Sequence, residues 1–343
     1  MPPDSKQNIG NPAAAGRSLA VRRECFPIRG GFRISRGSKT EAEVVVAELR
    51  EGGLLGRGEA VPYARYGESP EAVVATLEGL AGAVAAGLDR EGLARLLPAG
   101  AARNALDCAL WDLEARRAGR PVWQLAGLGL APGPVVTAFT LSLDRPEAMA
   151  AAARAVGGRP LLKLKLGGQE VLERVRAVRA AVPRARLMVD ANEAWSLDQL
   201  HHLAPELARL GVELIEQPLP AGADDGLRPG AAGPVPLAAD ESCHGRDSLE
   251  RLVGRYQLIN IKLDKTGGLT EALRLKAAAE AAGLGIMVGC MVATSLAMAP
   301  ALLVAQGAAV VDLDGPLLLA VDRVPGLRYE SATVYPPEPG LWG

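Results

Sequence analysis

The sequence predicts an α/β fold in which a closed barrel of parallel strands is joined to a smaller α+β domain. Short Leu/Ile/Val-rich runs recur roughly every 25 residues between positions 160 and 320, and each interval leaves room for a loop, a helix and the next strand. The region before these runs lacks that alternation. The chain has 343 residues, which exceeds the size at which one hydrophobic core usually stops growing and favours two domains.

The predicted barrel spans residues 127–320, and Gly127–Gly133 is the linker that leads into it. Its strands are apolar runs that end in polar residues: LLKLKL, RLMVDAN, ELIEQP, PLAADE, LINIKLDK and VVDLDG. Ala/Leu/Arg-rich stretches between the runs predict helices at Gln169–Val182, Ser196–Leu210, Ser248–Val253 and Thr270–Ala282. Eight such strands close a barrel, and active sites in this architecture lie at the C-terminal ends of the strands.

Residues 18–126 predict an α+β capping domain. The segments Ser18–Pro27, Phe32–Ser35 and Glu43–Glu51 have the pattern of antiparallel strands, with Arg-Gly-Gly and Glu-Gly-Gly as turns. Helices are predicted at Pro70–Gly87, Asp89–Leu97 and Ala101–Ala118, with Ser69 and Asp89 as N-caps. The tail, residues 321–343, follows the last barrel strand, and we expect it to return to the capping domain.

Composition excludes several classes of partner. The net charge of −1 argues against nucleic acid and anionic membranes, because proteins that bind them usually carry a basic excess. No apolar run is long enough to span a bilayer. Residues 1–17 are rich in Pro, Ala, Gly and Asn and lack the apolar centre of a signal peptide, so they predict a disordered lead-in.

Cysteine and histidine give no sign of a metal centre or a disulfide framework. The cysteines are far apart and form no CxxC pair, which fits a reducing cytoplasm; they are Cys25, Cys108, Cys243 and Cys290. The three histidines are too few and too scattered for a His-ligated metal, and we expect surface or loop positions for them; they are His201, His202 and His244.

Paired polar residues at the ends of the apolar runs predict where the site lies. Residues i and i+2 of a strand point to the same face. Three pairs have this spacing: Lys163/Lys165, Asp190/Asn192 and Asp312/Asp314. An isolated pair of this kind is usually a solvated strand face or a turn, but charges inside a barrel are costly unless they have partners. We therefore expect the pairs to converge at one mouth of the barrel.

The motifs KLK, VDANEAW, IEQP, ADES and NIKLDKTGG, in this order and at these spacings, resemble those of the enolase superfamily, in its muconate-lactonising subgroup and among its dipeptide epimerases. Further similar segments extend the resemblance over nearly the whole chain: FRISRGSKTEAEVVV, GEAVPYARYGES, AARNALDCALWDLEARR, ADESCH, INIKLDKTGGLTEAL and DLDGP. The resemblance implies a (β/α)7β TIM-like barrel, capped by the N-terminal segment and the C-terminal tail. It also implies Mg²⁺-dependent epimerisation of a dipeptide, L-Ala-L-Glu to L-Ala-D-Glu, by 1,1-proton transfer through an enediolate, in cytoplasmic degradation or recycling of murein peptides.

Asp190, Glu216 and Asp240 stand at the ends of successive predicted strands. Three carboxylates make a hard oxygen site suited to Mg²⁺, a cation that keeps open positions for substrate oxygens. Asn192 is placed to order the surroundings of the ion, and Glu241 is a weaker candidate for the same role.

Lys165 and Lys262 are the predicted acid and base. They lie on the second and sixth strands, across the barrel from each other, so one would remove the α-proton and the other would deliver a proton to the opposite face. Lys163 would lower the pKa of Lys165, and the metal would lower the pKa of both lysines. Lys265 is the rival to Lys262, but it falls in the following loop.

Substrate recognition depends more heavily on the resemblance. It assigns Asp312 and Asp314 to the α-ammonium of the substrate's first residue, since relatives that act on acylated substrates need no such pair. Arg36 and Lys39 lie where the family places specificity and would meet an acidic side chain such as glutamate, although a solvated loop position is an equally good reading. The remaining predicted pocket residues are Lys163, Cys290, Met291 and Thr294.

Other functions stay open at this point. An o-succinylbenzoate synthase or a muconate cycloisomerase would use the same lysines and metal, but the Asp312/Asp314 pair argues against both. An epimerase for another dipeptide class, or a barrel that binds a ligand without chemistry, is a further alternative. Gly167–Gly168 and Gly267–Gly268 lack a phosphate-loop context and predict tight turns. A homo-oligomer is compatible with the sequence, which does not set its number of subunits.

Overall fold

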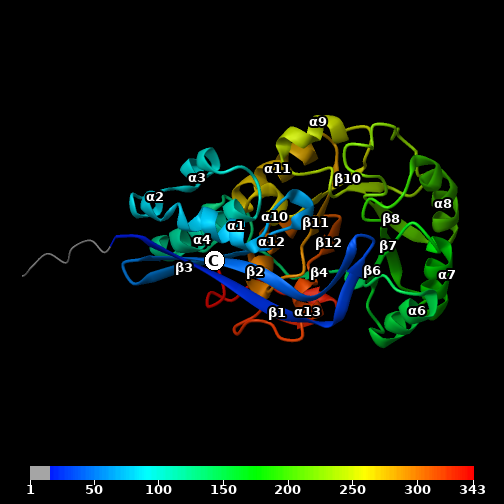
Figure 1. The fold of residues 1–343 in the computed structure, drawn as a ribbon, viewed down its shortest axis with the longest axis horizontal. Coiled ribbons are helices and arrows are strands. Elements are labelled where there is room, and N and C mark those ends of the chain that lie inside the picture. The colour runs from blue at the N-terminus through cyan, green and yellow to red at the C-terminus, as the bar shows by residue number, and fades with distance from the viewer. Residues whose placement is uncertain (1–15) are drawn as a thin grey trace, which may run out of the picture.

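The computed structural model describes residues 16–343, and Figure 1 shows an N-terminal α+β part, coloured blue to cyan, beside a barrel coloured green to orange. The predicted lead-in lies outside the described residues except for Gly16 and Arg17. In the described part of the chain no helix has both the length and the apolar character needed to cross a membrane.

The capping sheet contains β1 (Ser18–Ile34), β2 (Gly37–Glu51) and β3 (Leu54–Ala60), paired antiparallel in that order. The predicted turn at Arg-Gly-Gly is wrong: Gly30 and Gly31 lie in an irregularity within β1, so the two predicted segments form one strand. The turn lies instead at residues 35–36.

Strand β3 was not predicted, because Gly56 and Gly58 interrupt its apolar pattern. These glycines let the strand approach α4 (Ala101–Ala118) closely. A Cβ atom on either would collide with the α4 backbone. The requirement for glycine here comes from packing, which sequence periodicity does not register.

The other capping helices are α1 (Pro70–Glu78), α2 (Ala81–Ala85), α3 (Arg90–Leu96) and α5 (Val122–Leu125). The predicted caps are confirmed: the side chains of Ser69 and Asp89 accept hydrogen bonds from the amides of Ala72 and Gly92. The single helix predicted at Pro70–Gly87 is divided into α1 and α2.

The barrel strands form a parallel eight-stranded sheet whose order follows the chain from β5 to β12. They are β5 (Phe139–Leu141), β6 (Leu161–Lys165), β7 (Arg186–Asp190), β8 (Val212–Glu216), β9 (Leu237–Ala239), β10 (Leu258–Ile261), β11 (Gly285–Gly289) and β12 (Val310–Asp312). The amide of Ala138 donates to the carbonyl of Val311 at 2.8 Å and brings the two ends of the sheet together. The predicted barrel with a separate antiparallel domain is confirmed.

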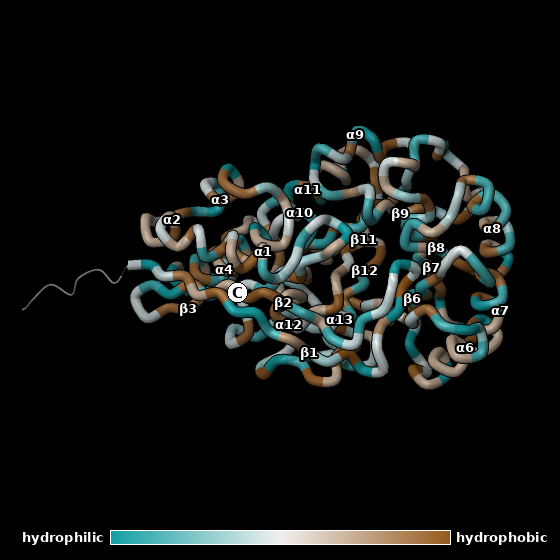
Figure 2. The backbone as a smooth tube through the Cα atoms, in the orientation of Figure 1, coloured by the Kyte–Doolittle hydropathy of each residue, from teal (hydrophilic) through white to brown (hydrophobic). Residues whose placement is uncertain are grey.

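Helices surround this sheet: α6 (Pro146–Ala155), α7 (Val171–Ala181), α8 (Leu197–Arg209), α9 (Leu249–Leu252), α11 (Leu269–Ala281) and α12 (Ser295–Ala305). Figure 2 shows α7 and α8 alternating between hydrophilic and hydrophobic colours, and their buried residues include Val175, Val178, Leu200 and Leu207. Residues 217–236, between β8 and β9, form turns where regular spacing implied a helix.

The C-terminal tail packs on the capping domain. The indole of Trp342 donates to the carbonyl of Cys108 at 3.1 Å, and the amide of Gly343 donates to Asp112 at 2.9 Å. A short sheet of β4 (Val135–Val136), β13 (Tyr329–Glu330) and β14 (Thr333–Val334) joins the tail to the linker, and α13 (Gly315–Leu318) precedes it. The tail therefore ties the two parts together.

Candidate active site

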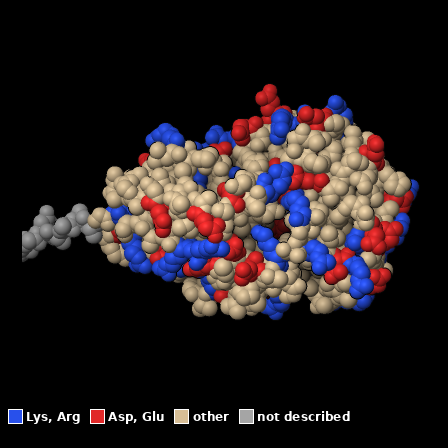
Figure 3. Space-filling view, viewed as in Figure 1, with Lys and Arg blue, Asp and Glu red and all other residues tan. Residues whose placement is uncertain are grey.

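A cavity of about 470 Å³ lies between the capping loops and the C-terminal ends of the barrel strands. Its lining includes Phe32, Lys39 and Tyr66 from the capping domain, and Lys165 and Lys262 from the barrel. Figure 3 shows a hollow near the centre of this face, with acidic atoms deep inside and basic atoms around its rim. The cavity is thus positioned where a barrel fold places its chemistry.

The strand ends bring the predicted charges into one layer. Lys165, Asp190 and Glu216 are the last residues of β6, β7 and β8, and their Cα atoms are paired in register. Asp240 and Lys262 directly follow β9 and β10. The arrangement comes from parallel pairing alone, because equivalent ends of neighbouring strands meet at the same edge.

Lys165 and Lys262 face the cavity from opposite sides, since β6 and β10 stand four strand positions apart in a sheet of eight. The Lys165 ammonium lies 2.6 Å from Asp190 Oδ2, and the Lys262 ammonium lies 2.7 Å from Asp240 Oδ2. Burial lowers the pKa of Lys262, but the neighbouring acids, Asp240 first and then Glu216, together outweigh burial and hold that pKa well above its usual range.

Lys163 lies deeper in the barrel than Lys165, with 1% of its surface exposed. Its ammonium is 2.7 Å from Asp312, 2.7 Å from Glu216 and 3.3 Å from Asp190. It does not reach the cavity lining of the described residues, where substrate contact was predicted. The structure instead places Lys163 as the internal counter-charge of three acids.

Lys265, in α10 (Leu263–Thr266), also points away from the cavity. Its ammonium donates to Asp240 Oδ1 at 2.6 Å and to the Asn260 carbonyl at 2.9 Å. The two lysines of the NIKLDK motif therefore bind different oxygens of one carboxylate, and only Lys262 lines the cavity. This geometry favours Lys262 over Lys265 as the group that meets substrate.

The three acids have different pKa values although they lie close together. Burial raises the pKa of Glu216 to about 7, with Asp190 adding to the effect and Lys163 opposing it. Burial also acts on Asp190, but Lys165 and Lys163 outweigh it and lower the pKa of Asp190 to about 2. Lys262 and Lys265 likewise hold the pKa of Asp240 well below its usual range.

The oxygen atoms around these acids fit a hard cation. Glu216 Oε2, Asn192 Oδ1 and Glu241 Oε2 are buried acceptors that receive no hydrogen bond within the described chain, and such atoms favour a cation as a partner. Lys163 lies near Glu216 Oε2, but its approach does not have hydrogen-bond geometry.

The three predicted metal ligands are not drawn tightly around a common point. Among residues 16–343, the trio with ligand atoms within 4.8 Å of one another is Cys25, Glu41 and the half-buried Glu43. The carboxylates of Asp190, Glu216 and Asp240 do not all lie within this distance of one another; the Lys163 ammonium bridges Asp190 and Glu216, and Lys262 binds Asp240. Shared coordination would require these side chains to exchange lysine contacts for the ion.

Asp312 lines the cavity at the end of β12, and Asp314 is buried behind it, accepting a 2.6 Å hydrogen bond from the Thr140 amide. Burial, with Asp312 adding to it, raises the pKa of Asp314 to about 7. Cys290 and Met291 line the cavity as predicted.

Thr294 was predicted to line the same pocket, but within the described chain it belongs elsewhere. Its hydroxyl hydrogen-bonds Glu59 of β3 at 2.5 Å and receives a hydrogen bond from Arg323 at 2.8 Å. Glu59 is fully buried and forms an ion pair with Arg323 at 2.7 Å. Thr294 therefore joins the capping domain, barrel and tail, because the chain after β11 turns its side chain toward β3.

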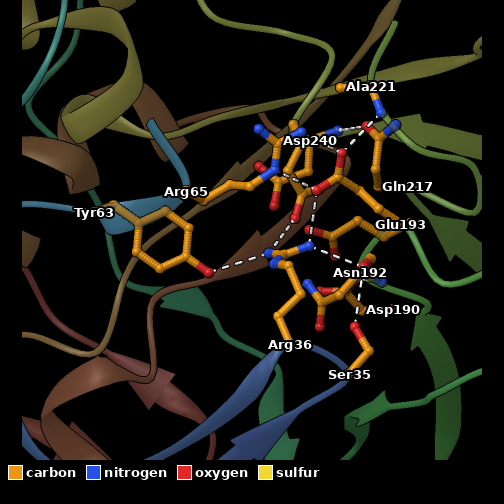
Figure 4. A network of polar contacts seen from close by, with 12 residues as sticks. Ser35, Arg36, Tyr63, Arg65, Asp190, Asn192, Glu193, Gln217, Ala221 and Asp240 are labelled. Atoms are coloured by element: carbon orange, nitrogen blue, oxygen red, sulfur yellow. Dashed lines mark hydrogen bonds and ion pairs between the residues drawn. The ribbon is translucent and has the colours of Figure 1, made fainter. Parts of the chain in front are cut away.

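The two predicted specificity cations are in different situations. Arg36 lies 2.9 Å from Glu193 and 2.7 Å from Glu241, and it also donates to the Tyr63 hydroxyl (Figure 4). Lys39 lies over the Tyr63 ring, 5.5 Å from its centroid, lines the cavity, and forms no ion pair with the residues that the structure describes. Its charge is thus available to a ligand, whereas that of Arg36 is already balanced.

Sequence reasoning missed several residues that organise the site: Arg65, Glu193, Gln217 and Asn260. Asn260 donates to Glu216 Oε1 at 2.8 Å, and the side-chain oxygen of Gln217 accepts from the Asp240 amide at 2.9 Å. Gln217 follows the predicted ligand Glu216 in the IEQP motif, and Asn260 lies two positions before the predicted acid/base Lys262 in NIKLDK, so their position was a signal. Nothing in the local pattern indicated the partners of Arg65.

Family models match both parts of the chain. The model described as "Mandelate racemase / muconate lactonizing enzyme, N-terminal domain" matches residues 17–127, and that described as "Enolase C-terminal domain-like" matches residues 147–341. The chain therefore belongs to the enolase superfamily, whose capped barrel it has.

Individual relatives indicate to which members of the superfamily this chain is similar. The chain is 48% identical to an L-Ala-D/L-Glu epimerase from Escherichia coli (strain K12) over 93% of this chain and 99% of that protein. It is 54% identical, with a TM-score of 0.92, to an Agrobacterium tumefaciens enolase-family structure described as homologous to dipeptide epimerases, with bound sodium and L-Ala-L-Glu, over 95% and 100% of the two chains. A dipeptide epimerase from Enterococcus faecalis, complexed with Mg and L-Leu-L-Tyr, matches at 31% identity and a TM-score of 0.87 over 94% and 98%.

Proposed function

We propose that this protein is a Mg²⁺-dependent dipeptide epimerase that interconverts L-Ala-L-Glu and L-Ala-D-Glu. The observation that carries the proposal is the pair Lys165 and Lys262, which face one cavity from opposite sides of the barrel. Inversion of a stereocentre by proton transfer needs one acid/base group on each face of the reacting carbon. The similarity to named dipeptide epimerases supports the same function.

In the proposed reaction, the α-carbon of the second residue lies between the two lysine side chains. The lysine on one side, in its neutral form, takes the α-proton, and the ammonium on the other side gives a proton to the opposite face. A cation held by Asp240 would offset the negative charge that raises the pKa of Lys262. Asp190, Glu216 and Asp240 would hold Mg²⁺, which when bound acts as a Lewis acid toward the substrate carboxylate. The Mg-bound neighbour from Enterococcus faecalis supports that choice of ion.

Charge at the two ends of the cavity supports a dipeptide with an acidic second residue. Asp312 lines the cavity and, with Asp314 behind it, would attract the α-ammonium of the first residue. Lys39 is the lining cation without an ion-pair partner in the described chain, and it would meet the side-chain carboxylate of glutamate. Degradation or recycling of murein peptides in the cytoplasm is the proposed setting.

A panel of dipeptides in D₂O with Mg²⁺ tests the function. Proton NMR should show deuterium entering the α-position of the second residue only, together with the L,D-isomer, and L-Ala-L-Glu should be among the best substrates. N-acetyl-glutamate is the comparison for a substrate without the free ammonium. Absence of α-exchange with every dipeptide, or elimination and cyclisation products from other carboxylates, would contradict the proposal.

A further inference from the structure

One glutamate joins two loops of the capping domain to the barrel. Glu193 accepts hydrogen bonds from Arg65 at 2.8 and 2.7 Å, from Arg36 at 2.9 Å and from the Ala221 amide at 2.8 Å. Figure 4 shows the arginines approaching it from the capping domain. Arg36 lies in the β1–β2 turn and Arg65 in the short η1 helix (Ala64–Tyr66). We call Arg36, Arg65 and Glu193 the clasp.

The backbone at this point has an unfavourable conformation. Asn192 and Glu193 have φ values of 44° and 68°, a left-handed region that residues other than glycine rarely adopt. Such a conformation persists only where its surroundings hold it. The Asn192 carbonyl accepts from Arg36 at 2.9 Å and from the Ser35 hydroxyl at 3.0 Å. The clasp therefore holds both residues of this turn.

This turn also orients Asp190, the predicted metal ligand that precedes it. The Asn192 amide donates to Asp190 Oδ1 at 2.9 Å, while Oδ2 of the same carboxylate lies 2.6 Å from Lys165. A change in the turn would move that amide and let the carboxylate rotate. Arg36 also binds Glu241, the neighbour of Asp240, at 2.7 Å. The capping loops thus contact Asn192, two positions after Asp190, and Glu241, which directly follows Asp240.

We propose that Glu193 is a positioning residue that couples docking of the two capping loops to the orientation of Asp190, and thereby to the affinity of the site for Mg²⁺. This inference rests on the proposed function for the identity of the cation. The Glu193 side chain is 7% exposed, but those of Arg36 and Arg65 are 26% and 37% exposed. Water therefore reaches the two arginines, whereas the strand-borne acids Asp190 and Glu216 are fully buried.

Two substitutions at position 193 separate the clasp from the backbone. Glu193→Ala removes the clasp and keeps the strained φ, whereas Glu193→Gly removes the clasp and relieves the strain. Glu114→Ala is the matched control, because Glu114 also binds one arginine, Arg90, through two nitrogens, and it lies within the capping domain. Calorimetric titration of the full chain with Mg²⁺, without substrate, gives the dissociation constant for each variant.

We expect Glu193→Ala to weaken Mg²⁺ binding by about tenfold or more, as loss of a residue that supports a metal ligand commonly does. Glu193→Gly should recover part of this loss, and Glu114→Ala should bind as the wild type does. Unchanged binding by Glu193→Ala, or equal losses in the alanine and glycine variants, would overturn the inference. If circular dichroism shows that Glu193→Ala does not fold, Glu193→Gln, which keeps the shape and loses the charge, replaces it with the same expectation.

The binding measurement also separates this inference from the proposed function. A wild-type protein that binds Mg²⁺ in a Glu193-dependent manner but exchanges no dipeptide proton would contradict the function and leave the clasp standing. A working epimerase whose Mg²⁺ affinity ignores Glu193 would do the reverse.

Discussion

Two groups of ion pairs differ in how they are supported. One is the clasp, and the other is the barrel floor, by which we mean Lys165, Lys262, Asp190 and Asp240 at the ends of the barrel strands. On the floor, Lys165 and Asp190 extend from neighbouring strands paired in register, and they are 7% and 0% exposed. In the clasp, the partially exposed arginines come from a turn and a short helix, far in sequence from Glu193. A strand fixes its side chains through the ladder of the whole sheet, whereas a loop contact can be broken locally. The proposed acid/base and metal-binding groups therefore lie at the ends of sheet strands, whereas the arginines of the clasp lie on a turn and a short helix of the capping domain.

The energetic consequences differ as well. Removal of one partner from a buried pair leaves an uncompensated charge and costs about 3–5 kcal/mol. An exposed pair typically contributes about 1 kcal/mol or less. Substitutions on the floor should therefore affect activity and folding strongly, while those on the capping loops should alter specificity and leave the fold intact.

Loss of either floor lysine should have the largest effect. Lys165→Ala and Lys262→Ala should each lower epimerisation of L-Ala-L-Glu by about 10²- to 10⁴-fold, the usual contribution of a general acid or base. Proton NMR in D₂O, started separately from the L,L- and L,D-isomers, measures both epimerisation and α-exchange. Lys276→Ala on α11, where the lysine binds backbone carbonyls away from the cavity, is the control. Near wild-type rates in both floor variants would refute the two-base scheme.

Loss of Lys39, the cavity-lining cation near the start of β2, should have a smaller and selective effect. Lys39→Ala should lower kcat/KM for L-Ala-L-Glu by about tenfold, roughly 1.4 kcal/mol of interaction with the substrate carboxylate. A dipeptide with an uncharged second residue should be turned over almost unchanged, and thermal unfolding should not shift. An equal loss for both substrates would show that Lys39 does not recognise the side chain of the second residue.

Asp314, which follows β12, should make KM for L-Ala-L-Glu depend on pH by a few-fold. The pKa of Asp314 is raised to about 7, so its carboxyl gains negative charge as pH rises through that value. KM for L-Ala-L-Glu should therefore fall between about pH 6 and 8, because the charged form attracts the substrate ammonium. Asp314→Asn should flatten this dependence. A pH profile that is the same in the variant would exclude Asp314 from ammonium binding.

The smallest effect should be on stability, at Asp264, which joins the barrel to the capping domain. Asp264 is buried and accepts from the Val61 amide at 3.0 Å and from the Asn104 side chain at 2.8 Å. Burial raises its pKa from 3.8 to about 7, so between these values the folded state binds a proton that the unfolded state has released. Its contribution to stability is therefore present at low pH and declines as pH rises toward 7.

Asp264→Asn removes this titration and should flatten the dependence of the melting temperature on pH between about 4 and 7, by a few degrees. Calorimetric melting of the wild type and the variant over this range measures it. Parallel curves for the two proteins would mean that Asp264 does not titrate in the folded state.

The regular part of the fold could be predicted because its signals are local. Apolar runs of strand length, capping residues such as Ser69 and spacings of one βα unit all follow from short-range backbone geometry. The exceptions have non-local causes. Strand β3 contains glycines that packing against α4 demands, and residues 217–236 form turns although the spacing left room for a helix.

By itself, the sequence determined which charged residues end the barrel strands and in what order, since alternation along a strand and parallel pairing leave little freedom. The tertiary structure alone decided how those charges divide: Lys165 reaches the cavity and Lys163 is buried beneath it, and Arg36 is balanced by Glu193 while Lys39 is left open. Depth in a barrel and contacts between distant loops depend on how the whole chain closes. No short segment carries that information.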